Sequence, residues 1–253
     1  MVFFQKSKRS LQNIFIKVFT SLPGSVIINR TIKFNRGEKM NLANIKVNFL
    51  GDSITEGCGT SAPDKTFHQL IAKKYGLAAA RNYGISGTRF AKQKNPTVNN
   101  PKFDRDFCSR FSTMDDDAEL VVVFGGTNDF GHGDAPIGEM SDRTSDTFYG
   151  ACHYLMSGLI NKYPESRIVF MTPLHRASEG NLNVNGVNLE YYVNIIKEVA
   201  AYYSLPVLDL WSVSGIQPCV PIIKEKYCPD GLHPNDKGHE KIAEVVGSFL
   251  SNL

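Results

Sequence analysis

The sequence predicts an α/β protein: a three-layer α/β/α sandwich around a five-stranded parallel, flavodoxin-like doubly wound sheet. Five short segments with strand signals alternate with amphipathic helical segments along residues 41–253, the order expected of parallel strands joined by crossover helices. Segment 119–124 is almost continuously apolar, as in a strand covered on both faces. No linker, composition shift or internal repeat interrupts 41–253, so one domain is expected there.

The first half of this domain supplies three strands. Segment 45–50 is a strand that runs into Gly51, and segment 66–75 is a helix stopped by Gly76. A second strand is predicted over 79–83 and a third, apolar strand over 119–124. Between them, the long connecting segment 91–118, called the excursion below, is polar and then acidic and has room for one short helix.

The second half continues the alternation. Asp142 or Ser145 is the expected cap of a helix that ends before Pro164. The segments that follow are a strand over 167–171, a helix over 189–203, a strand over 206–210 and a closing helix over 236–250. In the closing helix the residues expected to face inward are Ile242, Val245 and Phe249.

The net charge of +3 divides unevenly along the chain. Residues 1–40 contain eight Lys or Arg and one acid, a net of +7, and residues 41–253 contain the other 20 bases and 24 acids, a net of −4. An acidic domain lacks the electrostatic footprint of a nucleic-acid-binding protein, so that class is excluded. No apolar run reaches the roughly eighteen residues of a membrane span.

Residues 1–40 form a basic N-terminal extension with three open interpretations. They are, in order of preference, a loosely packed arm, an amphipathic helix that contacts a membrane surface, and a signal peptide. The chain has five cysteines, and an odd number in a chain of this length favours reduced thiols over a disulfide framework. The spacing of Cys219 and Cys228 leaves one loop bridge as an alternative. We therefore expect a cytoplasmic protein, with membrane-associated or secreted locations as alternatives.

Ligands of doubly wound sheets bind beyond the carboxyl ends of the strands, so the segments after the strands are the places to look for chemistry. Ser53 follows the first strand in Gly-Asp-Ser-Ile and is a candidate nucleophile, unless it or Asp52 only caps a helix. Asp230 and His233 precede the last helix, three residues apart. There the carboxylate can orient the imidazole and the imidazole can take the serine proton.

Two further strand ends offer donors for an oxyanion. Gly87, in Ile-Ser-Gly-Thr, can present a backbone N–H without a side chain in the way, or form a plain turn. Asn128, in Gly-Thr-Asn-Asp, can donate from its amide, or form an Asx turn. With the backbone N–H of Ser53, they would make three donors at one sheet edge.

The sequence therefore has four blocks, which contain in chain order Ser53, Gly87, Asn128 and the Asp230–His233 pair. Together and in this order they resemble the blocks of the SGNH hydrolases, also called GDSL esterases and lipases. The resemblance covers residues 44–250 and implies Ser53 as nucleophile, His233 as base and Asp230 as its acid partner. It also implies an oxyanion hole made by Ser53, Gly87 and Asn128. Thr88 and Arg89 follow Gly87, where many members of the family carry an acidic or amide residue, so the surrounding acyl pocket is expected to differ.

Competing motifs fit less well. Gly57 to Ala62 matches G-x-G-x-x-A, but it begins seven residues after the strand and lacks the downstream ribose-binding acid. The nucleophile elbow of α/β-hydrolases, His-Glu-x-x-His and Walker patterns are absent. A metal phosphoesterase would have to use Asp52, Asp129, Asp230 and His233, and it would leave Ser53 and Asn128 without a role.

The sequence therefore predicts a serine carboxylic ester hydrolase that needs no cofactor and no metal. The polar segments 91–118 and 130–146 favour small acyl esters, chiefly acetyl, of a carbohydrate or other polar alcohol. A lysophospholipase acting at membranes, and a non-catalytic binding module, are the alternatives. His132 and His175 are candidate pocket residues and Arg89 and Arg176 candidate substrate or ion-pair residues, whereas His68, His153 and His239 are assigned to packing or surface. The sequence does not give the oligomeric state.

Overall fold

The computed structural model describes residues 40–253, which form a parallel sheet of five strands in the order β2-β1-β3-β4-β5. The predicted fold class is confirmed, including the flavodoxin-like strand order. The strands are β1 (Lys46–Gly51), β2 (Ala79–Gly84), β3 (Leu120–Phe124), β4 (Arg167–Met171) and β5 (Val207–Leu208). The three interpretations of the N-terminal extension concern residues that, apart from Met40, lie outside the described part of the chain.

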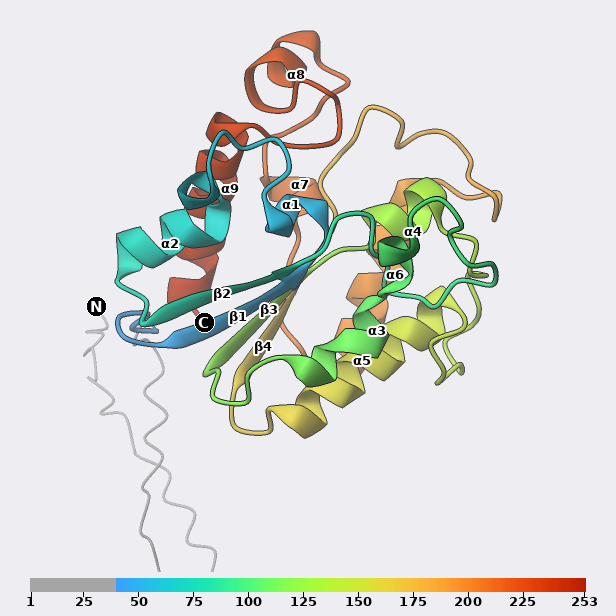
Figure 1. The fold of residues 1–253 in the computed structure, drawn as a ribbon, viewed down its shortest axis with the longest axis horizontal. Coiled ribbons are helices and arrows are strands. Elements are labelled where there is room, and N and C mark those ends of the chain that lie inside the picture. The colour runs from blue at the N-terminus through green and yellow to red at the C-terminus, as the bar shows by residue number, and fades with distance from the viewer. Residues whose placement is uncertain (1–39) are drawn as a thin grey trace, which may run out of the picture. The chain divides into compact units, whose positions relative to one another are not determined.

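Helices cover both faces of the sheet (Figure 1). One face carries α2 (Phe67–Tyr75) and α9 (Asp236–Ser251), and the other carries α3 (Phe107–Arg110), α5 (Phe148–Lys162) and α6 (Leu189–Tyr202). Alternate strand residues point to opposite faces. In β3, Val121 and Val123 therefore pack into the α5–α6 core, while Val122 packs into the α2–α9 core. Burial on both faces explains why β3 is apolar throughout.

Short helices follow the strands at the carboxyl edge of the sheet: α1 (Ser53–Glu56), α4 (Thr127–His132) and α7 (Leu210–Val213). Figure 1 shows α8 (Pro221–Tyr227) projecting beyond this edge. The connections also contain the 3₁₀ turns η1 (Pro63–Lys65), η2 (Pro101–Asp104) and η3 (Phe111–Thr113). Helices α4, α7 and α8 were not predicted, because segments of four to seven residues contain too few turns for a periodic signal.

Two local predictions were wrong. Helix α5 begins after Thr147, whose hydroxyl accepts from the Gly150 N–H, and neither Asp142 nor Ser145 caps it. The fifth strand is only two residues long, because Leu210 already starts α7. In α9, Ile242 is buried and Val245 and Phe249 are half-buried against the same core, so the three residues predicted to face inward do so, beside Val246 and Leu250.

The five cysteines, all within the described residues, are free thiols. Cys219 and Cys228 therefore do not form the loop bridge that their spacing allowed. Among residues 40–253, no helix is both long enough and apolar enough to cross a membrane.

Candidate active site

Ser53 is the first residue of α1, directly beyond the end of β1. Asp52 caps this helix, because its carboxylate accepts from the Ile54 N–H at 3.0 Å. The capping function thus belongs to Asp52 and leaves the Ser53 hydroxyl free for another partner. The N–H of Ser53 is one of the first four of a helix, which have no acceptor within it.

The hydroxyl of Ser53 lies 3.0 Å from Nε2 of His233, a residue 180 positions away in the chain. On the other side of the ring, Nδ1 lies 2.7 Å from Oδ2 of Asp230. A carboxylate can only accept in this contact, so the proton is assigned to Nδ1 and the lone pair of Nε2 faces the serine hydroxyl. The structure therefore brings the three predicted residues together in the order acid, imidazole, hydroxyl.

The Asp230 carboxylate is held in its ionised form. Burial opposes ionisation, but backbone N–H groups of His233 and Leu232 donate to Oδ1 at 2.7 and 2.8 Å, and the His233 ring donates to Oδ2. These donors outweigh burial and keep the pKa of Asp230 below its usual value. A fixed negative charge therefore faces the imidazole at neutral pH.

The predicted oxyanion donors lie on the segments that follow β2 and β3. Gly87 has a φ of +75°, in the left-handed region that favours glycine, and its N–H has no acceptor among the described residues. Asn128 lies in the first turn of α4, where one Nδ2 hydrogen is donated to the Thr88 carbonyl at 3.0 Å. An amide has two such hydrogens, so one stays available for a ligand.

Asp129, the residue after Asn128, joins these two segments. Both carboxylate oxygens of Asp129 accept backbone N–H groups at 3.0 Å, one from Phe90 and one from Ala91. Burial raises the pKa of Asp129 to about 6, against the effect of these two donors. Asp129 thus fixes the Gly87 segment against the Asn128 segment.

With the geometry described, the comparison with known proteins is informative. The sequence profile of the GDSL-like lipase/acylhydrolase family matches residues 49–241. The chain belongs to this family. The resemblance seen in the four sequence blocks is thereby confirmed, and with it the assignment to a family of acylhydrolases. No curated protein matches the sequence significantly.

Several solved structures share the fold. A protein from Lactobacillus plantarum is 30% identical, with 82% of this chain and 97% of that chain covered and a TM-score of 0.72. The lipase/acylhydrolase from Enterococcus faecalis is 21% identical, with coverages of 82% and 95% and a TM-score of 0.55. A two-domain esterase active on acetylated mannans is 20% identical, with coverages of 83% and 49% and a TM-score of 0.54.

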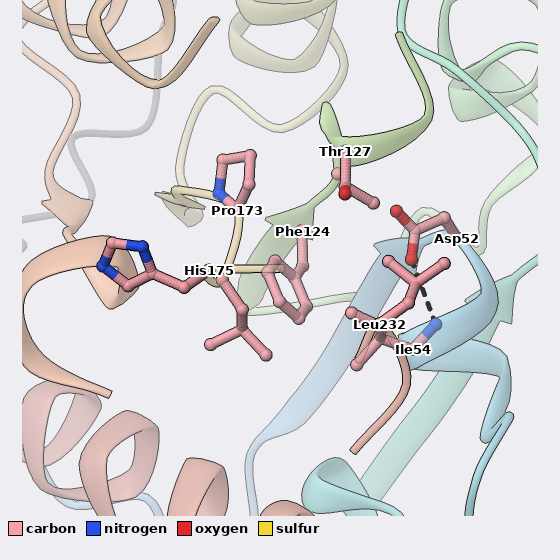
Figure 2. A pocket seen from close by; sticks show the side chains of 9 residues that line it. Asp52, Ile54, Phe124, Thr127, Pro173, His175 and Leu232 are labelled. Atoms are coloured by element: carbon pink, nitrogen blue, oxygen red, sulfur yellow. Dashed lines mark hydrogen bonds between the residues drawn. The ribbon is translucent and has the colours of Figure 1, made fainter. Parts of the chain in front are cut away.

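In this GDSL-like chain a small pocket is lined by residues next to the predicted site residues, and Figure 2 shows the side chains around it. Asp52, Thr127 and Leu232 line it, and each immediately precedes a predicted site residue. The other lining residues are Ile54, Phe124, Gly125, Pro173, Leu174 and His175. Figure 2 shows the His175 ring directed away from the Asp52 and Thr127 side chains, and it packs against Trp211 at 3.8 Å between centroids and 35° between planes. His175 thus borders the pocket without pointing into it.

The other candidate polar residues have mainly structural contacts. Arg89 is buried and pairs with Asp104 at 2.7 Å. Of the two roles predicted for it, substrate binding or an ion pair, the structure shows the ion pair. Arg176 donates to the Thr127 carbonyl at 3.1 Å, and among the described residues it has no carboxylate partner within salt-bridge distance. The histidines assigned to packing or surface are fully buried in the core: His68, His153 and His239.

Two competing motifs are not supported by this arrangement. Gly57 to Ala62 is a turn after α1 that leads into η1 and does not open a long helix. Within residues 40–253 there is no group of three or more His, Cys, Asp or Glu side chains arranged to hold a metal ion.

Arg110 is a residue near the site that the sequence did not indicate. Its buried guanidinium donates to the carbonyls of Gly51 and Tyr83 at 2.7 and 2.5 Å, and to the Thr88 hydroxyl at 3.1 Å. It therefore ties the ends of β1 and β2 to the residue after Gly87. Burial lowers its pKa to about 10, which leaves it charged at neutral pH. Its partners are mostly backbone carbonyls, which carry no sequence signal.

Replacing Arg110 with methionine is expected to lower the free energy of unfolding by about 3 kcal/mol, because buried carbonyl groups lose their donors. Urea unfolding at neutral pH measures the change. Arg167→Gln is the matched control, since Arg167 is exposed at the start of β4, and it should stay within about 0.5 kcal/mol of the unmodified protein. Equal stability of the two variants would show that the Arg110 contacts do not stabilise this edge of the sheet.

Proposed function

We propose that the protein is a serine ester hydrolase that removes small acyl groups, chiefly acetyl, from a carbohydrate or other polar alcohol. The observation that carries the proposal is the continuous set of contacts from Asp230 to His233 at 2.7 Å and from His233 to Ser53 at 3.0 Å. Nucleophile, base and orienting acid lie within hydrogen-bonding distance in the order that acyl transfer requires.

In the first half of the reaction, Nε2 of His233 takes the hydroxyl proton of Ser53 while Oγ forms a bond to the acyl carbon. Asp230 stabilises the resulting imidazolium without taking its proton. The carbon–oxygen bond to the alcohol then breaks, and Nε2 returns the proton to the leaving alcohol. The product of this half is an acyl-enzyme on Ser53.

In the second half, water loses a proton to Nε2 of His233 and its oxygen attacks the acyl carbon. The bond to Ser53 Oγ breaks, the serine regains the proton, and the carboxylic acid leaves. In both halves the negative oxygen would be stabilised by the N–H groups of Ser53 and Gly87 and the second Nδ2 hydrogen of Asn128. Removing one such donor typically lowers kcat by about 10²–10³-fold.

A polar alcohol moiety is supported by the surface beside His233. A groove of about 660 Å³ runs between α8, the start of α9 and the turn after α1. A Cβ atom on Gly59 in that turn would overlap the Pro234 carbonyl and lie 3.3 Å from Cβ of His233, so the groove adjoins the segment that carries the predicted base. Its lining is mainly polar or charged: Gly59, Thr60, Ser61, Ile222, Glu225, Lys226, Asn235, Asp236 and Lys237. Hydroxyl-rich alcohols suit such a surface better than alkyl chains do.

A lipid ester is the alternative substrate, and one observation favours it. Leu182, Val184 and Ile222 are 72%, 77% and 64% exposed on segments that follow β4 and β5. Exposed aliphatic side chains near a catalytic edge can contact lipid. The basic extension, residues 1–40, would add attraction to anionic membranes.

We expect kcat/KM to fall steadily from acetyl to palmitoyl esters of p-nitrophenol, and acetylated oligosaccharides to release acetate. A series with one leaving group measures the acyl preference alone, and lysophosphatidylcholine tests the lipid alternative. The Ser53→Ala protein supplies the background rate for each substrate. Highest activity on long-chain esters or on the lysophospholipid would replace the acetyl-ester proposal with the lipid one.

A further inference from the structure

An aromatic ring covers the glycine that is the predicted backbone oxyanion donor. A Cβ atom on Gly87 would overlap ring atoms of Phe103, so the ring lies directly against the Gly87 backbone. Phe103 comes from η2, in the polar excursion after β2, and it is half-buried. Part of the ring is therefore still open to solvent or to a bound molecule.

The ring of Phe103 is held in place by a network of contacts. The His132 ring lies beside it, at 5.2 Å between centroids and 34° between planes. Arg89 lies next to His132, with Nη1 at 3.2 Å from Nδ1 of the imidazole. The Arg89 guanidinium also pairs with Asp104, the neighbour of Phe103, at 2.7 Å, and Asp104 accepts from the Thr97 backbone N–H at 2.7 Å. Displacing the ring would disturb the contacts of the buried Arg89 guanidinium, a charge that is costly to leave unpaired.

An ester bound for reaction has its carbonyl oxygen at the N–H of Gly87. The acyl carbon is then only a few ångströms from the Gly87 backbone, and the acyl substituent has to pass close to whatever covers it. We propose that Phe103, braced by His132, forms the end wall of the acyl pocket and restricts the enzyme to acyl groups of a few carbons. This inference rests on the proposed esterase function and explains its preference for short acyl groups.

The wall predicts a selective gain of activity on longer acyl groups. In Phe103→Ala, the ratio of kcat/KM for hexanoyl over acetyl p-nitrophenyl ester should rise at least about tenfold, since one methylene in a pocket changes discrimination by about 10–200-fold. The ratio is the readout, because the ring also packs against the Gly87 backbone and its loss can lower both rates together. Phe103→Leu, which is smaller but still apolar, should give an intermediate ratio.

Two controls separate the acyl wall from other roles of the ring. Phe249→Ala removes a half-buried phenylalanine from α9, and it should leave the hexanoyl-to-acetyl ratio unchanged. A second series keeps the acetyl group and varies the alcohol, and Phe103→Ala should leave the relative rates within that series unchanged. The rate of labelling by fluorophosphonates of increasing alkyl length gives the same comparison without turnover.

The outcomes distinguish failure of this inference from failure of the proposed function. An unmodified protein that hydrolyses no ester and reacts with no fluorophosphonate overturns both. An active Phe103→Ala protein with an unchanged acyl profile overturns only the wall. A change confined to the alcohol series also overturns it, because the ring would then lie on the leaving-group side. If the alanine variant does not fold, the Phe103→Leu profile decides in the same way.

Discussion

Replacing Ser53 with alanine is expected to lower kcat for the acetyl ester by about 10⁶-fold, the loss typical of a serine nucleophile. The change removes the protein atom that would bond to the acyl carbon. It leaves the helix cap intact, since Asp52 and not Ser53 accepts from the Ile54 N–H. Alanine also suits a helix start sterically, so the unfolding transition should stay near that of the unmodified protein.

The measurement combines turnover with covalent labelling. A fluorophosphonate should add to the unmodified protein at the peptide that contains Ser53 and should not add to the alanine variant. Ser86→Ala is the matched control, because Ser86 follows β2 and its hydroxyl bonds to the Glu56 carboxylate and lies 3.1 Å from Cys58 Sγ. That variant should label normally. Equal turnover or labelling in Ser53→Ala would exclude Ser53 as nucleophile.

The same experiment tests the non-catalytic alternative. A binding module that retains the fold would bind the substrate analogue reversibly and form no covalent adduct on Ser53. The contact between Ser53 Oγ and His233 Nε2 at 3.0 Å makes adduct formation the expected result.

The candidate site residues were more predictable from the sequence than the residues that hold them in place. Ser53, Gly87, Asn128 and the Asp230–His233 pair each follow a strand signal, and parallel strands bring such segments to one edge. Arg110 gave no such signal, since its partners include the carbonyls of Gly51 and Tyr83. Its role depends on a fold in which these strand ends adjoin, and no spacing along the chain encodes that.

The start of α5 was not predictable, because several residues before it can serve as its cap. Before α5, Asp142, Ser145 and Thr147 all have suitable side chains. Asp142 instead accepts from the Thr147 hydroxyl at 2.8 Å and from the Glu139 N–H at 3.1 Å, which closes the preceding loop. Tertiary hydrogen bonding therefore decides among residues that are equivalent by type. The same limit applies to Phe103, whose contact with Gly87 depends on how the excursion after β2 folds back.

Replacing Asp230 with asparagine is expected to lower kcat by about 10⁴-fold, the loss associated with an imidazole in the wrong tautomer. The Asn oxygen can still accept from the Leu232 and His233 N–H groups, which Oδ1 does at 2.8 and 2.7 Å. The amide nitrogen would then replace Oδ2 beside Nδ1 of His233. Being a donor, it would leave the ring proton on Nε2, where the serine proton has to go.

The stability of this variant provides a separate readout. The pKa of Asp230 is lowered in the folded protein, because backbone and ring donors outweigh burial. The carboxylate therefore stabilises the fold above the usual aspartate pKa of about 4, and this contribution is lost as the pH falls through the lower, folded-state value. The difference in unfolding free energy between Asp230→Asn and the unmodified protein should be constant at neutral pH and shrink in acid.

Asp117→Asn is the matched control, because Asp117 also has a lowered pKa but pairs with Lys46 and Arg81, ahead of β3 and away from the site. Its kcat should stay within about twofold of the unmodified value, since it contacts none of the three reacting groups. The double variant Ser53→Ala/Asp230→Asn should be no slower than Ser53→Ala alone, because residues that act as one unit lose activity only once. A further large loss in the double variant, or a kcat for Asp230→Asn within tenfold of the unmodified protein, would show that Asp230 does not act through His233 on Ser53.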